Sequence, residues 1–249
     1  AEHLCASRGY TVLNDDVIRD SKILIVLAQG EPSAEFPLGR AFALYQDDDG
    51  ALPYSPDDTV ILPAIPLVKQ LRNLHSIVPG NVPGVWMLST EAVWVLGDEQ
   101  KPFGDLSPSS LTAFCSPVAA KVAAQHGSYD LNDDLAIRSL AYREPPVDET
   151  AEAHLILGLL YLPPLISSHF LALASTNPLS RATYHGLDSG AIGLRLSLFF
   201  DIVYSTCSEL EEFVRCRMAP EKIDCAHSDL LELARRVIHG KLSKFQSRA

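Results

Sequence analysis

The sequence LILGLLYLPPLISSHFLALA, residues 155–174, is the centre of a run from His154 to Ser180 that carries no charged residue. A run of this length and apolar content is long enough to span a bilayer. However, Pro163 and Pro164 stand at its middle, where they would remove two helical N–H donors and break a single spanning helix. We therefore expect no membrane span, and we predict two buried helices that join at the prolines.

Upstream of this run, the chain has the pattern of strands and turns. Residues 23–27 form a continuous β-branched and leucine run, which is typical of a strand buried on both faces. Residues 85–88 and 92–96 are two further apolar runs separated by a short polar segment, and they predict a hairpin. Apolar residues at helical spacing predict a helix over 67–78. We expect residues 1–105 to form a strand-rich, mixed α/β region.

The remaining residues, 106–249, have the pattern of helices. Ser116-Pro117 and Gly127 bracket residues 118–126 as a short helix, and Asp133-Asp134 marks the start of another. The clearest helix is the last, because its apolar residues recur at steps of three and four: Leu230, Leu231, Ala234, Val237, Ile238, Leu242 and Phe245. We predict an α+β fold with a strand-rich N-terminal part and a predominantly helical C-terminal part, which could pack as one continuous domain.

The composition favours a folded protein and argues against one that mainly coats nucleic acid. Hydrophobic residues make up 47% of the chain, enough for a packed core. The 31 acidic and 20 basic residues give a net charge of −11, whereas phosphate binding needs surplus Lys and Arg. The chain is basic only after Glu232, where four residues are candidates for polyanion binding: Arg235, Arg236, Lys241 and Lys244. Cations at this place equally suit a solvated helix end with a negative dipole.

The cysteines and aspartates do not form a recognisable metal site. The chain has five cysteines, which are too few for a disulfide scaffold and cannot all pair with one another. We therefore expect a reducing, cytoplasmic location or a virion. Cys207, Cys216 and Cys225 lack the close pairing that zinc sites show, and we predict that they are buried apolar residues. The paired aspartates are interpreted as helix starts and turns rather than as ligands of Mg²⁺ or Ca²⁺. We expect no metal and no cofactor.

The segment Leu187-Asp188-Ser189-Gly190-Ala191 resembles the active-site loop of retroviral-type aspartic proteases, in which two such aspartates share one proton. Gly186 stands where that family has an apolar strand residue, and a helical pattern follows where the family has strands. We therefore interpret the segment as a turn. A Ser-His-Asp triad built from distant residues stays open, because triads depend on geometry and not on order. Its first candidates are His185, Asp188 and Ser189.

Two tryptophans and a methionine on the predicted hairpin, Trp86, Met87 and Trp94, are candidates for an interface. Aromatic residues and Met are enriched where proteins meet, but the same residues would equally suit a core.

No nucleophile elbow, phosphate-binding loop or dinucleotide fingerprint occurs in the sequence. We therefore expect a non-enzymatic structural subunit of a homo- or hetero-oligomeric assembly, such as a viral coat or coat-associated protein.

Two other functional hypotheses stay open at this point. One is a hydrolase whose site is assembled from distant Ser, His and Asp residues or from carboxylates that hold a metal. The other is a nucleic-acid binder that uses the basic tail at residues 235–248.

Overall fold

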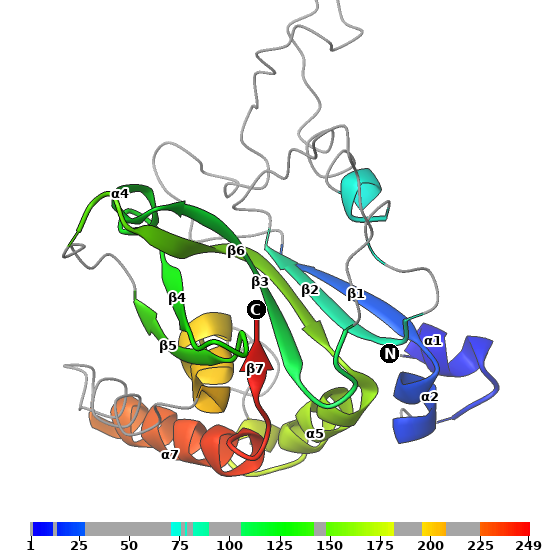
Figure 1. The fold of residues 1–249 in the computed structure, drawn as a ribbon. Coiled ribbons are helices and arrows are strands. Elements are labelled where there is room, and N and C mark those ends of the chain that lie inside the picture. The colour runs from blue at the N-terminus through cyan, green and yellow to red at the C-terminus, as the bar shows by residue number, and fades with distance from the viewer. Residues whose placement is uncertain are drawn as a thin grey trace, which may run out of the picture.

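A computed structural model describes nine parts of the chain: residues 2–11, 14–27, 71–75, 78, 82–89, 106–141, 148–181, 196–207 and 225–249. Helices and strands alternate irregularly along these residues (Figure 1). The strands are β1 (Lys22–Leu27), β2 (Gly84–Ser89), β3 (Leu111–Ala119), β4 (Ser128–Leu131), β5 (Ile137–Ala141), β6 (Glu152–Leu162) and β7 (Ser247–Arg248). The helices are α1 (Glu2–Ser7), α2 (Asp15–Arg19), α4 (Ala120–Ala123), α5 (Pro164–Ala174) and α7 (Cys225–Leu242), with the short turns η2 (Leu179–Arg181), η3 (Leu198–Val203) and η4 (Tyr204–Thr206). Residues 71–75, within the predicted helix over 67–78, are also helical.

The seven strands form one mixed sheet in the order β1-β2-β6-β3-β7. β1 runs parallel to β2, and both β2 and β3 run antiparallel to β6. The β4–β5 hairpin joins the same side of β6 as β2, but at the opposite end: β4 pairs with residues 154–155, and β2 with residues 159–162. β6 is therefore the central strand, and β1 is an edge strand (Figure 1).

The prediction of two helices across residues 155–174 is wrong, because the first half of this stretch is the central strand β6. Pro163 lies between the strand and the helix, in an extended conformation, and α5 begins at Pro164. Neither proline removes a needed hydrogen bond there, since a helix leaves its first N–H groups without internal partners. In the parts of the chain that the structure describes, no helix combines the length and the apolar character that crossing a membrane requires.

The expectation that residues 106–249 are predominantly helical is also wrong. β3, β4, β5, β6 and β7 all lie in this part of the chain. Ser116 and Pro117, which were expected to start a helix, belong to β3 and pair with Leu155 and His154 of β6. Asp133 and Asp134 lie in the turn of the β4–β5 hairpin. In both places the hydrogen bonds of the sheet prevail over a local signal for a helix start.

The prediction of strands at residues 23–27 and 85–88 is confirmed by β1 and β2. The second strand of the predicted hairpin, residues 92–96, lies outside the described residues. The predicted last helix is confirmed by α7, whose Leu231, Ala234, Ile238 and Leu242 are buried.

The core has two layers, one on each face of the sheet. On one face, Leu160 and Leu162 of β6 pack with Ile166 of α5 and with Val203 and Tyr204. The end of α7 extends this layer, because Ile238 and Leu242 pack with Leu173 of α5. The other face buries Trp86, Leu88, Leu159 and Tyr161 of the strands against Leu74 and Val78. The helices α5 and α7 thus cover one face of the sheet (Figure 1).

Candidate functional site: an open sheet edge and a neighbouring cleft

The outer side of β1 carries main-chain groups that have no partner among the residues the structure describes. The carbonyl oxygen of Ser21 accepts a hydrogen bond from the amide of Gly84 at 2.8 Å. Because main-chain groups alternate in direction along a strand, Ile23 and Ile25 also face β2, whereas Leu24 and Val26 point their N–H and C=O groups outward. No hydrogen bond joins these outward groups to any residue that the structure describes. The edge is therefore able to accept another strand.

The side chains of β1 are apolar on both faces of the sheet. Leu24 lies beside Trp86 and Ile25 beside Met87, so that the two side chains point to opposite faces. Each side chain is 40% exposed. The expectation that this strand is buried on both faces is therefore wrong. Sheet edges in soluble monomers usually carry charges, prolines or bulges that block pairing, and β1 has only Lys22, at its start.

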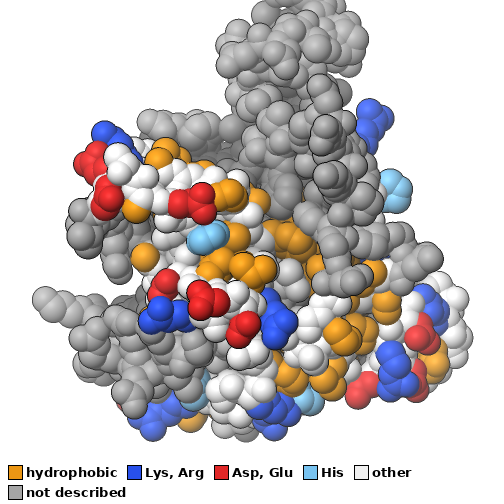
Figure 2. All heavy atoms as spheres, viewed as in Figure 1, with side chains coloured by type: hydrophobic (Ala, Val, Ile, Leu, Met, Phe, Trp, Pro, Cys, Tyr) orange, Lys and Arg blue, Asp and Glu red, His pale blue; other side chains and the backbone are white. Residues whose placement is uncertain are grey.

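A cleft of about 970 Å³ lies between α2 and α5, close to the start of β1. Its polar lining comes from Asn14, Asp15, Asp16 and Arg19 on one side, and from Ser168, His169 and Ser175 on the other. Asp16 and Arg19 form an exposed ion pair at 3.1 Å. In the space-filling view, hydrophobic side chains gather over the sheet and toward α2 and α5, and charged side chains lie mainly around them (Figure 2).

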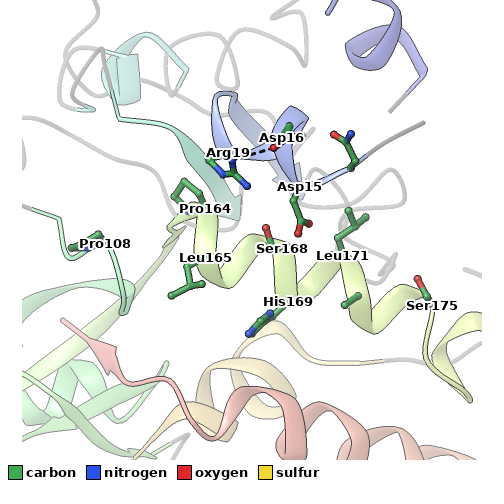
Figure 3. A pocket seen from close by; sticks show the side chains of 12 residues that line it. Asp15, Asp16, Arg19, Pro108, Pro164, Leu165, Ser168, His169, Leu171 and Ser175 are labelled. Carbon is green, nitrogen blue, oxygen red and sulfur yellow. Dashed lines mark ion pairs between the residues drawn. The ribbon is translucent and has the colours of Figure 1, made fainter. Parts of the chain in front are cut away.

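Asp15, Ser168 and His169 line the same cleft, but they are not connected as a catalytic triad. Ser168 is directed toward Asp15, whereas the ring of His169 is directed toward α7 (Figure 3). The His169 ring lies 5.0 Å from the ring of Phe245. Among the hydrogen bonds of the described residues, none joins these three side chains. The arrangement therefore lacks the contact by which a histidine activates a serine.

The surroundings of His169 favour its neutral form. Burial lowers the pKa of His169 from its usual value of 6.5, and Lys244 and Lys241 lower the pKa further. Asp15 acts in the opposite direction and raises the pKa. The charge of the imidazole is therefore opposed by cations at the end of α7 and favoured by a carboxylate on α2.

Trp86 is a core residue and not an exposed interface residue. Its side chain is 1% exposed, and its ring lies 4.7 Å from that of Tyr161 and 6.0 Å from that of Phe114. Met87 is half-buried and packs against the layer under α5. Trp94 lies outside the described residues, and so do the triad candidates His185, Asp188 and Ser189.

The four predicted polyanion-binding residues do not share one surface. Arg235 is buried, and its Nε donates to Oδ1 of Asp201 at 2.7 Å. It is therefore not available to a polyanion. Arg236 is exposed but pairs with Glu232 on the same helix. Lys241 and Lys244 are exposed, and Nζ of Lys244 lies 5.1 Å from the centre of the Phe245 ring.

The sequence pattern of β1 does not distinguish an edge strand from a central one. A continuous apolar run has the same pattern in a central strand and in an edge strand, so the pairing partners alone distinguish the two. Within the described ranges, no three His, Cys, Asp or Glu side chains lie close enough together to hold a metal ion. Comparison of the sequence with known protein families and with curated proteins finds no match.

Proposed function

We propose that this chain is a structural subunit that works through contacts with other protein subunits in a larger assembly, with a viral coat or coat-associated protein as the concrete form. The observation that carries the proposal is the open edge of β1. It combines outward main-chain groups at Leu24 and Val26 with exposed apolar side chains at Leu24 and Ile25.

Two physical terms favour a partner at this edge. An added strand satisfies main-chain N–H and C=O groups and so extends the sheet. It also removes the exposed parts of Leu24 and Ile25 from water, which contributes about 1 kcal/mol for each side chain. An apolar edge without such a partner is a site of uncontrolled aggregation, so an assembly contact is the use that best fits this strand.

The hydrolase alternative has weaker support. The cleft between α2 and α5 holds Asp15, Ser168 and His169, but the described side chains form no activated nucleophile. A reducing, cytoplasmic location or a virion remains part of the proposal. No disulfide joins the described cysteines Cys5, Cys115 and Cys207, which is in keeping with such a location.

The native mass of the purified chain tests the proposal. Light scattering is expected to give a mass well above the 27.2 kDa of one chain. Leu24→Lys places a charge on the edge strand and is expected to lower the mass toward that of a monomer. Leu233→Lys is the matched control, because Leu233 is a similarly exposed leucine on α7, at 44%. A wild-type chain that is monomeric at every concentration contradicts the proposal.

A further inference from the structure

We infer that the partner at β1 is a second copy of this chain, whose own β1 pairs antiparallel so that Ile25 lies opposite Ile25 of the second copy. This inference rests on the proposed function and names its partner. Two sheets would thereby join into one continuous sheet across a twofold axis.

The hydrogen-bonding pattern of the edge is compatible with this register. Leu24 and Val26 carry the outward main-chain groups, and they stand two residues apart. In an antiparallel pair, outward-facing residues must lie opposite each other, and each such pair exchanges two hydrogen bonds. A twofold axis at Ile25 places Leu24 opposite Val26 of the second copy, and Val26 opposite Leu24. Every outward group of these two residues then has a partner.

The side chains suit the same register. The Ile25 residues of the two copies would meet as a non-hydrogen-bonded pair, in which Cα atoms are about 4.5 Å apart and the side chains are closest. Leu24 of each copy would pack beside Val26 of the other on the opposite face. Apolar pairs of this kind stabilise neighbouring strands, and they cover the 40% of Leu24 and Ile25 that one chain leaves exposed.

The single charge on the strand distinguishes this register from its competitors. Lys22 is the only charged residue of β1 and stands at its start. With the axis at Ile25, the two Lys22 residues lie at opposite ends of the joined pair. An axis at Leu24 would place Lys22 opposite Val26, and parallel pairing would place the two lysines side by side, where like charges are destabilising. Of these three arrangements, the axis at Ile25 is the one that places Lys22 opposite neither an apolar residue of β1 nor a second lysine.

A cysteine placed on the proposed axis tests the register. Ile25→Cys is expected to give a disulfide-linked dimer as the main product of mild oxidation, because the expected Cα separation lies within the range that a disulfide bridges. Ile23→Cys is the matched control. Ile23 has the same side chain and points to the same face, but the Ile23 residues of the two copies would be about 13 Å apart. Wild-type protein measures any linkage through the natural cysteines.

A second variant tests the edge without a new thiol. Val26→Pro removes an outward N–H and leaves the hydrogen bonds to β2 intact, so the chain is expected to remain folded and to become monomeric. Equal linkage of the two cysteine variants, or a V26P chain that still associates, overturns the register. If the wild-type mass nevertheless exceeds 27.2 kDa, the proposed assembly function stands. A monomeric wild-type chain overturns both.

Discussion

Arg235 of α7 and Asp201 of η3 form a buried ion pair that connects these two elements. Nε of Arg235 donates to Oδ1 of Asp201 at 2.7 Å, and the two side chains are 6% and 1% exposed. The other carboxylate oxygen of Asp201 accepts from the amide of Ser197 at 2.6 Å. The pair therefore connects segments that are 34 residues apart in the sequence.

Replacement of Arg235 by Met is expected to lower the free energy of unfolding by about 3–5 kcal/mol, because Asp201 would remain as a buried charge without its partner. Denaturant unfolding measures the change. The control is Arg236→Met, which breaks an exposed pair with Glu232 and is expected to cost about 0.5 kcal/mol. If the two variants lose equal stability, the ion pair does not hold α7 in place.

Replacing either of two tyrosines by phenylalanine is expected to change the free energy of unfolding, with opposite sign in the two cases. The hydroxyl of Tyr129 is buried and has no hydrogen-bond partner among the described residues, whereas that of Tyr161 donates to the carbonyl of Pro83 at 2.8 Å. Tyr129→Phe is expected to raise the free energy of unfolding by about 1 kcal/mol, and Tyr161→Phe to lower it by about 1 kcal/mol. Thermal and denaturant unfolding of both variants tests this. Loss of stability in Tyr129→Phe would mean that the hydroxyl has a bonded partner.

Two glycines form a further matched pair. Gly84 has a φ of +128°, and an added Cβ would lie 2.6 Å from the carbonyl oxygen of Leu162. Gly84→Ala is expected to cost about 1–3 kcal/mol of stability, since it strains the start of β2. Gly240, near the end of α7, has no atom within 4 Å of an added Cβ. Gly240→Ala is expected to stabilise the helix by about 0.5–1 kcal/mol. Equal effects in unfolding experiments would contradict this geometry.

His169 predicts a dependence of stability on pH. Its pKa is lowered by burial, and then by Lys244 and Lys241, so the folded chain favours the neutral imidazole. This contribution to stability is present above the unfolded-state value of 6.5 and is lost as the pH falls through the lower folded-state pKa. His169→Gln is therefore expected to lose less stability than wild type between neutral pH and about pH 5. A pH profile of His169→Gln that is identical to that of the wild type contradicts the prediction.

The elements that were predictable from sequence are those with a clear period or composition. α7 repeats its apolar residues at steps of three and four, and β1 and β2 are β-branched or aromatic runs of strand length. The sequence of residues 155–162 predicts a helix wrongly, because a continuous apolar run has no period that separates a buried strand from a buried helix. β6 is a strand because it pairs with strands on both sides. Pairing between segments that are distant in the sequence cannot be predicted from a local pattern.

The features of the candidate site also divide into those that the sequence could predict and those that depend on the fold. The burial of Arg235 could be predicted from the sequence, because Arg235 stands four residues after Leu231 and three before Ile238. This spacing places it on the apolar side of α7. The open edge of β1 was not, because it depends on which strand occupies each side of β2. The cleft was equally hidden, since α2 and α5 are brought together from residues about 150 positions apart in the sequence.

Amide hydrogen exchange along β1, measured over a range of protein concentrations, tests the edge-pairing account most directly. The N–H groups of Ile23 and Ile25 face β2 and are expected to be protected at every concentration. Those of Leu24 and Val26 face outward and are expected to exchange quickly in dilute protein and slowly in concentrated protein, as the second copy covers them. Fast exchange at Leu24 and Val26 at all concentrations would contradict the pairing of two chains through β1.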